Sequence, residues 1–156
     1  MLTMNRTLDE KIGNIDRVYL TDNDLFHLER FASNFSARLE AYNLLRDRAD
    51  ELVVRSLKLL AQQYPDLVQK HLQRCKYDMS HILRYMALAI LRDDEAFFKD
   101  SLMDWHANII HSYQMSSECS TAYRLLQEVA GQMLSPQSSS FVKPYLEIAV
   151  STFTNV

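Results

Sequence analysis

Apolar residues recur along most of the chain with the three- and four-residue spacing of amphipathic helices. The first stripe is short and comprises Leu8, Ile12, Ile15 and Tyr19. Thr21 and Asp24 have the spacing of a capping box, which predicts that a second helix begins there. The next stripe covers residues 25–60 and is too long for one straight helix. We therefore expect a break near Arg46–Arg48 and an end at Pro65, because the residue before a proline is pushed out of the helical region.

The second half of the chain continues as a run of helices. Helices are predicted over about 66–91, 93–113 and 116–133, each with apolar residues on one face. The serine-rich stretch 135–140 is predicted to be a loop. A last helix is expected over 141–153, with a proline in its first turn, where that residue is tolerated.

Composition supports this all-α interpretation. Only two glycines and three prolines interrupt 156 residues, which favours long helices over a fold rich in turns. Hydrophobic residues make up 47% of the chain and charged residues 24%, as is usual for a globular protein. The length suits one domain, so we predict a single all-α domain over residues 1–156, with about seven helices of unequal length.

Several functions are disfavoured by what the sequence lacks. A net charge of −3 without a lysine or arginine cluster argues against binding to nucleic acid. No apolar run approaches membrane-spanning length, and the N-terminal residues lack the apolar centre of a signal peptide, so we predict a cytoplasmic protein that does not span a membrane. The glycine-rich phosphate loops, HExxH and CxxC are missing, so neither a phosphate loop nor a metal site is expected. No acid–base or nucleophile–base pair is visible, and we predict that the chain is not an enzyme.

The most informative segment is 74–85. Cys75 lies one helical turn before Asp78, so a thiol and a carboxylate should point from the same side of one helix. The apolar stripe continues after them with Met79, Ile82, Leu83, Met86 and Ile90. A nucleophile and an anion at the rim of an apolar surface suit covalent capture of a large, flat, nitrogen-rich molecule better than turnover. Cys119 lacks such a context, and we interpret it as a half-buried free thiol.

Residues 75–85 resemble the central segment of the phycobiliproteins, the bilin-carrying, globin-like family that includes phycocyanin and allophycocyanin. That segment reads Cys-x-Arg-Asp-x-x-x-x-Leu-Arg-Tyr, and only its first arginine is replaced here, by Tyr77. Upstream, further family landmarks are matched by Tyr19, Leu20, Leu28, Phe31, Arg38 and Ala49. The similarity covers most of residues 10–113 and fades after that.

The resemblance implies a globin-like helical bundle, preceded by a helical extension over residues 1–20 through which the subunit dimerises. It also implies a linear tetrapyrrole of the phycocyanobilin type, attached through a thioether at Cys75. Asp78 would then accept hydrogen bonds from the central pyrrole N–H groups. A carboxylate in that position stabilises the protonated chromophore, and charge-assisted hydrogen bonds hold it rigid, which favours fluorescence over loss of the excitation.

The chain departs from the family pattern in the stretch before the cysteine. It lacks the usual Gly-Gly-Asn loop and Arg-Arg pair, and Lys70 and His71 occupy the positions of that pair. Together with Arg74 they are the cations expected to bind the propionates. Trp105 stands where many relatives have a small residue, and it could either stack on a bilin ring or fill the space of the missing loop. The implied bilin site therefore comprises Cys75, Asp78, Lys70, His71, Arg74, Tyr77 and Trp105.

The dimer interface implied by the resemblance includes the N-terminal stripe. The family's first helix carries an acid that pairs across the dimer with the arginine equivalent to Arg84, but Asn14 falls at that position and Asp16 lies two residues on. We infer a divergent, allophycocyanin-like paralogue. The interface residues expected are Leu8, Ile12, Ile15, Asp16, Tyr19 and Arg84.

The expected partners are a second copy or another phycobiliprotein-like subunit, and a bilin lyase that attaches the pigment. The cytoplasmic or stromal face of thylakoids is a candidate location. Harvesting and sensing of light both remain open. Two alternatives to a pigmented protein are a colourless phycobilisome-type interaction protein and, with weaker support from scattered histidines, a haem-globin-like sensor.

Overall fold

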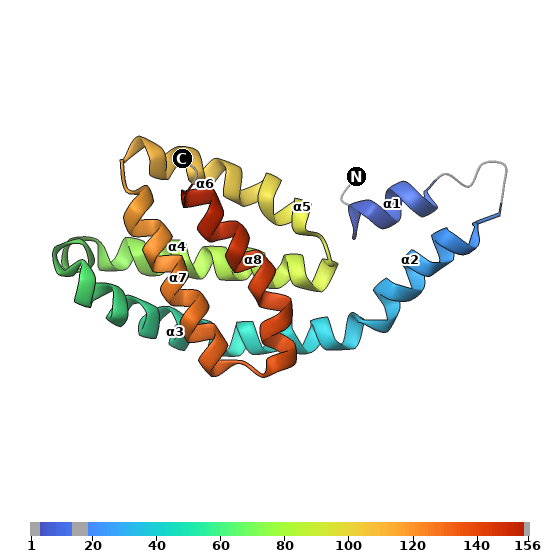
Figure 1. Ribbon diagram of the computed structural model, residues 1–156, viewed down its shortest axis with the longest axis horizontal. Helices are drawn as coiled ribbons and strands as arrows, with labels where there is room; N and C mark the ends of the chain where they lie inside the picture. Colours follow the sequence, from blue (N-terminus) through green and yellow to red (C-terminus); the bar gives the residue numbers. More distant parts are fainter. Residues whose placement is uncertain (1–3, 14–18, 155–156) are drawn as a thin grey trace.

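The computed structural model describes residues 4–13 and 19–154, and helices make up nearly all of them (Figure 1). No strand occurs in this part of the chain, which confirms the all-α prediction. The elements are α1 Arg6–Ile12, α2 Asp22–Ser33, α3 Phe35–Gln63, α4 Pro65–Arg92, α5 Glu95–Phe98, the π-helical turn η1 Lys99–Met103, α6 Asp104–Ser112, α7 Ser116–Met133 and α8 Pro136–Thr154. When α5, η1 and α6 are counted as one continuous element, the described residues form seven helical elements, as predicted.

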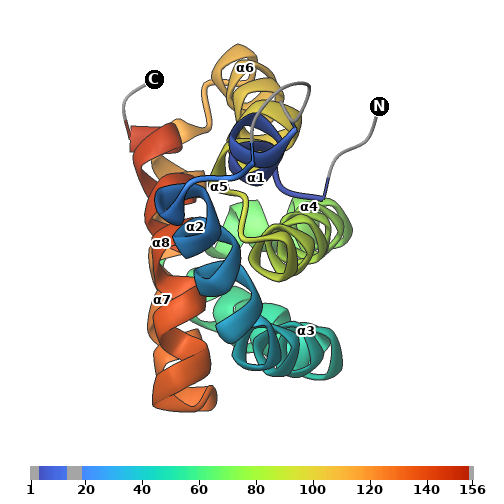
Figure 2. The same cartoon turned by 90° about the vertical axis from the view of Figure 1, so that its right-hand side faces the viewer.

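Four long helices, α3, α4, α7 and α8, build the bundle that contains the core. Helix α3 packs chiefly against α4, and α7 packs chiefly against α8. Figure 2 shows α7 and α8 on one side of the bundle and α3 and α4 on the other. The apolar stripes meet between them, and fully buried side chains from the four helices include Leu52, Ile82, Leu126 and Leu146. Burying one such side chain contributes about 1.5–3 kcal/mol to the stability of the folded state. Packing of these apolar faces, rather than helix propensity, therefore stabilises the bundle.

Helix α3 is continuous over 29 residues, so the break predicted near Arg46–Arg48 is wrong. The charged residues there face outward, and Arg46 Nε donates to Asp47 Oδ1 at 2.8 Å on the surface. The chain bends instead at Asn34, between α2 and α3. Pro65 ends α3 as predicted and occupies the first turn of α4.

Helix α8 begins earlier than its sequence suggests. The stretch 135–140 was predicted to be a loop, but α8 starts at Pro136. The Ser138 N–H donates to Ser135 Oγ at 3.2 Å, so this serine caps the helix and the proline fills its first turn. Pro144 consequently lies inside α8 rather than in its first turn, which corrects the prediction.

The element between α4 and α7 contains an irregularity that matters for the site. Asp93 ends α4 in the left-handed region, with φ 53°, and Asp94 Oδ1 accepts a hydrogen bond from the Phe97 N–H at 2.9 Å. The π-helical turn η1 then inserts one extra residue into the helical repeat. The buried face therefore passes through Leu102 and Met103 to His106, and Trp105 is left 57% exposed.

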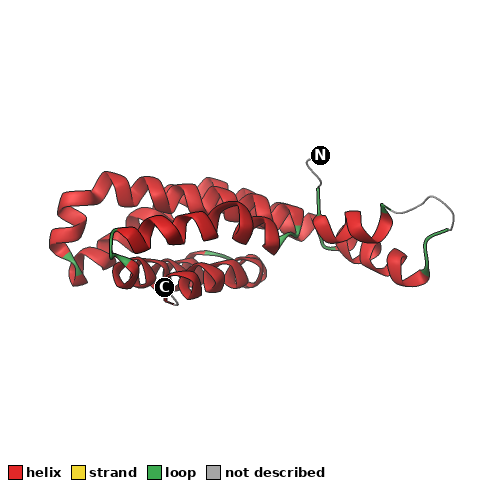
Figure 3. Cartoon of the chain, turned by 90° about the horizontal axis from the view of Figure 1, so that it is seen from above, coloured by secondary structure: helices red, strands yellow, loops and turns green. Residues whose placement is uncertain are grey.

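The N-terminal helices α1 and α2 lie beyond one end of the bundle (Figures 1 and 3). The Asn5 side chain donates to Arg92 O and Asp93 O at 2.9 and 2.7 Å, which docks the start of α1 on the end of α4. The predicted capping box is confirmed, since the Thr21 side chain accepts from Asp24 N–H and Asp24 accepts from Thr21 N–H. Helix α2 buries none of its residues within the chain.

Candidate functional site

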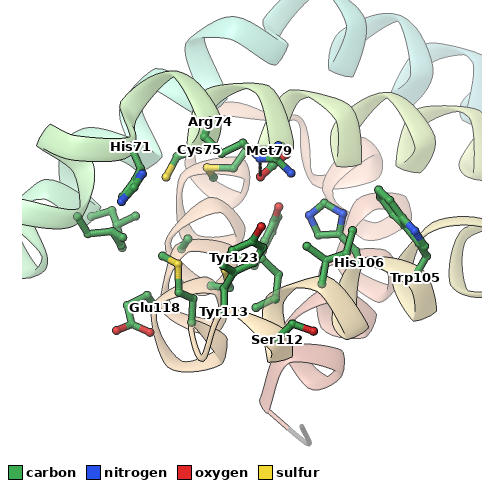
Figure 4. Close-up of a pocket in the computed structure, with 18 residues that line it drawn as sticks. His71, Arg74, Cys75, Met79, Trp105, His106, Ser112, Tyr113, Glu118 and Tyr123 are labelled. Atoms are coloured by element: carbon green, nitrogen blue, oxygen red, sulfur yellow. Dashed lines mark hydrogen bonds and ion pairs between the residues drawn. The ribbon is translucent and has the colours of Figure 1, made fainter.

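A cavity of about 710 Å³ opens between α4, α6 and α7 (Figure 4). Its volume lies within the range of pockets that hold small molecules and cofactors. Most of its lining is apolar or aromatic, with a few polar side chains among them. The lining residues are Leu60, Leu67, His71, Arg74, Cys75, Asp78, Met79, Trp105, His106, Ile109, Ile110, Ser112, Tyr113, Met115, Glu118, Cys119, Ala122 and Tyr123.

Helix α4 supplies the charged and reactive side of the cavity. Cys75 and Asp78 both line it and are both half-buried. Arg74 Nε donates to Asp78 Oδ2 at 2.8 Å, as expected for side chains four residues apart on a helix. This hydrogen bond raises the pKa of Arg74. Asp78 is therefore held by a cation at the rim of the cavity, with 16% of its side chain exposed.

The thiol of Cys75 is hard to ionise. Burial raises its pKa, and the negative charge of Asp78 raises it further. Since the thiolate is the nucleophilic form, Cys75 reacts slowly at neutral pH unless a base removes its proton.

A kink in α4 brings further groups to the same cavity. His71 has non-helical backbone angles, φ −125° and ψ 21°, inside the helix. It lines the cavity on one side of the kink, and Arg74 and Cys75 line it on the other. The segment before the cysteine thus wraps the cavity as a bent helix.

Two residues expected at the bilin site lie elsewhere. Lys70 is exposed and does not line the cavity. Tyr77 is 60% exposed, also does not line it, and stacks on His81 with 5.9 Å between ring centroids. Both side chains leave α4 away from the cavity, because their positions along the helix differ from those of Arg74, Cys75 and Asp78. Trp105 does line the cavity, at its exposed edge, and packs edge-on against His106.

Helices α6 and α7 supply the opposite wall, where Glu118 lines the cavity beside three buried side chains, those of His106, Cys119 and Tyr123. Burial lowers the pKa of His106, raises the pKa of Cys119 to about 12, and raises the pKa of Tyr123 well above its ordinary value. All three are therefore uncharged at neutral pH. Nδ1 of His106 is buried and has no hydrogen-bond partner among the described residues.

The sequence pattern does not mark these three residues as part of the site. Cys119 is the half-buried thiol that was expected, but its place in the cavity was not. His106 was missed because the apolar stripe of a regular helix passes through Trp105, and the π-helical turn moves the buried face by one residue. No sequence signal marks that turn. Tyr123 lies on the apolar stripe of α7 and looks like an ordinary core residue.

The expected interface residues fall in different environments. Leu8 is buried within the chain, Ile12 is half-buried, and Tyr19 is fully exposed. Arg84 is exposed on α4 and approaches His81 Nδ1 at 3.3 Å. Ile15 and Asp16 lie outside the described residues.

Other types of site find no support within the described residues. No group of three or more His, Cys, Asp and Glu side chains is arranged there to hold a metal ion. In the same part of the chain, no helix combines the length and apolarity needed to cross a membrane.

Comparison with known proteins identifies the class to which this fold and cavity belong. Residues 12–153 match the family described as phycobilisome protein, so the chain belongs to that family and has its all-α, globin-like fold. The C-phycocyanin beta chain of Galdieria sulphuraria is 26% identical over 94 residues. That match covers 55% of this chain and 55% of the relative, so the chain spans about half the length of the curated protein it matches. Family membership also agrees with the prediction that the chain is not an enzyme.

Proposed function

We propose that this protein is a pigment carrier of the phycobiliprotein type, with a linear tetrapyrrole of the phycocyanobilin class bound through a thioether to Cys75. The main support for this proposal is the cavity beside Cys75. In a member of the phycobilisome protein family, a cavity of about 710 Å³ is lined by both Cys75 and Asp78. The bound tetrapyrrole would supply light absorption, and the protein would supply attachment, charge and rigidity.

The residues of the cavity fit this group. The Cys75 thiol would add across a carbon–carbon double bond of the bilin, with sulfur on one carbon and the thiol hydrogen on the other, so no oxidant is needed. Asp78 would accept hydrogen bonds from pyrrole N–H groups. Arg74 and His71 line the cavity and would bind the propionates, whereas Lys70 lies outside.

The raised pKa of Cys75 supports the need for a lyase. Because few thiolates form at neutral pH, spontaneous attachment would be slow. A partner that removes the proton while presenting the bilin would overcome this limit.

A colourless interaction protein remains the second candidate. Asp78 is already paired with Arg74. Tyr77, which replaces a family arginine, does not line the cavity. The cavity therefore offers few cations to a dicarboxylate pigment. Such a protein would keep the family fold and its partners without carrying pigment.

We further propose that residues 1–156 act as one domain whose N-terminal helices bind a second copy or a related subunit. The support is the outer surface of α2, where Leu25, Phe26 and Leu28 are 41%, 58% and 36% exposed. Apolar side chains that find no cover within the chain are typical of an interface. Phe26→Glu should lower the oligomeric state in analytical ultracentrifugation without unfolding the chain, and Glu29→Lys on the same helix serves as a charge-change control.

The pigment proposal is tested by producing the chain together with bilin-synthesising enzymes and a lyase. Zinc-enhanced fluorescence on a denaturing gel should reveal a covalent pigment in the parent and in Cys119→Ala, but not in Cys75→Ala. A correctly folded parent that stays colourless with lyases supplied would favour the interaction protein instead.

A further inference from the structure

The wall from α6 and α7 contains two uncharged polar side chains that the attachment chemistry does not use. His106 and Tyr123 are only 4% and 3% exposed, and both line the cavity. Nδ1 of His106 is buried and has no hydrogen-bond partner among the described residues. The Tyr123 hydroxyl makes no side-chain hydrogen bond to them either, although its oxygen is not among the fully buried unpaired atoms. Polar side chains this deeply buried are nearly always paired in folded proteins, so two side chains at one cavity without a partner in the chain point to a ligand.

Both rings are fixed in place by the same residue. The Tyr123 ring stacks on Phe153 with 5.3 Å between centroids, and the His106 ring meets Phe153 edge-on at 6.1 Å. Phe153 is itself 1% exposed. Ser120 and Thr154 join α7 to α8 through a hydrogen bond of 3.0 Å beside this contact. The two side chains are thus preorganised at the cavity, across from the charged residues of α4 (Figure 4).

The chemistry of this pair differs from that of Asp78 and Arg74. Burial lowers the pKa of His106 and raises that of Tyr123, so both side chains are neutral at physiological pH. Across the cavity, the charged or titratable groups that act on His106 are Asp78, Arg74 and His81, and their effects on its charge oppose one another. A neutral hydroxyl and a neutral imidazole suit an uncharged polar group better than a carboxylate.

We propose that His106 and Tyr123 together bind one of the two terminal lactams of the bilin and hold that end ring rigid. The lactam presents a carbonyl acceptor beside an N–H donor, and these match a hydroxyl and an imidazole nitrogen. This inference rests on the proposed function, which it deepens by assigning one uncharged end ring of the pigment to α6 and α7. The charged centre of the pigment remains with Asp78.

The test measures non-covalent binding, so that attachment does not mask affinity. In a Cys75→Ala background, purified phycocyanobilin is titrated and followed by its absorbance and fluorescence. His106→Leu and Tyr123→Phe should each weaken binding about tenfold, as expected for one lost hydrogen bond in a buried site. The double variant should lose less than the product of the two effects, because both side chains bind one group. His111→Leu, an exposed histidine on α6, and Tyr42→Phe, which lies outside the cavity, are the controls and should bind like the parent.

A second readout separates ligand binding from a structural role. Replacing the unpaired imidazole with leucine removes a buried polar group, so His106→Leu should leave the melting temperature of the pigment-free protein unchanged or raise it. Unchanged affinity in both variants, or an affinity loss that follows a fall in stability, would overturn the inference and leave the pigment proposal standing. If the chain bound bilin neither covalently nor non-covalently, both proposals would be overturned.

Discussion

The two walls of the cavity divide its chemistry. The α4 wall holds a thiol, a carboxylate and a guanidinium, and the last two form an ion pair at 2.8 Å near the surface. The wall from α6 and α7 holds the carboxylate of Glu118 and, beside it, an imidazole, a phenol and a second thiol that burial keeps uncharged. We propose that the α4 wall attaches and charges a ligand and that the buried, uncharged groups of the other wall orient it.

The two thiols offer the largest contrast between the walls. The pKa of Cys119 is about 12, so at neutral pH its thiolate is about a thousandfold scarcer than that of a free thiol. Maleimide should therefore label Cys75 well before Cys119 in the folded protein. The rates are measured by peptide mass spectrometry, with Cys75→Ala and Cys119→Ala to isolate each thiol. Equal labelling rates for Cys75 and Cys119 in the folded protein would show that the two thiols do not differ in their ionisation.

Loss of the Asp78 carboxylate should strongly weaken binding of the bilin, while covalent attachment at Cys75 persists. Asp78→Asn removes the anion that would bind the pyrrole N–H groups, and a charge-assisted hydrogen bond contributes about 1.5–3 kcal/mol. We expect non-covalent bilin binding to fall about 10- to 100-fold, and the covalent product to absorb at shorter wavelength with weaker fluorescence. Asp50→Asn, an exposed aspartate on α3, is the matched control. Spectra identical to those of the parent would remove Asp78 from the site.

The cations of α4 should separate into those that bind the ligand and those that do not. Arg74→Gln is expected to weaken bilin binding several-fold through the lost propionate contact, at roughly 1 kcal/mol for a partly exposed charge. Lys70→Gln should have no effect, because Lys70 does not line the cavity. Isothermal titration of both variants measures this difference. An equal loss in Lys70→Gln would restore that residue to the site.

The smallest effect concerns the pH dependence of folding. Because the pKa of His106 is lowered in the folded state, the unfolded chain binds more protons as the pH falls below about 6.5. This contribution to the free energy of unfolding is present above that pH and is lost on acidification. His106→Leu should therefore flatten the acid side of a plot of melting temperature against pH, and His111→Leu should not. If the slope of melting temperature against pH were unchanged in His106→Leu, protonation of His106 would not be coupled to unfolding.

The α4 wall could be predicted from the sequence because α4 is regular through its key turn. Cys75 and Asp78 are three residues apart, and the helical period alone places them on one side. The other wall could not be predicted, because the π-helical turn Lys99–Met103 shifts the buried face from Trp105 to His106. The kink at His71 likewise has no local sequence signal of the proline or glycine kind.

The fold followed from apolar periodicity wherever breakers were clear. Pro65 marked the boundary between α3 and α4, and Thr21 marked the start of α2. The serine-rich stretch was misinterpreted because Ser135 and Pro136 together form a helix start as readily as a loop. The break predicted near Arg46–Arg48 is wrong because charged residues on the outward-facing side of a long helix do not interrupt it.

Every role proposed for the cavity depends on a bilin bound to the sulfur of Cys75. The most direct test of this attachment is the mass of the peptide that contains Cys75, taken from protein made with bilin-synthesising enzymes and a lyase. We expect this peptide to carry one added phycocyanobilin mass while the peptide with Cys119 stays unmodified. An unmodified Cys75 peptide from folded protein under these conditions, or a pigment found on Cys119, would show that Cys75 is not the attachment site.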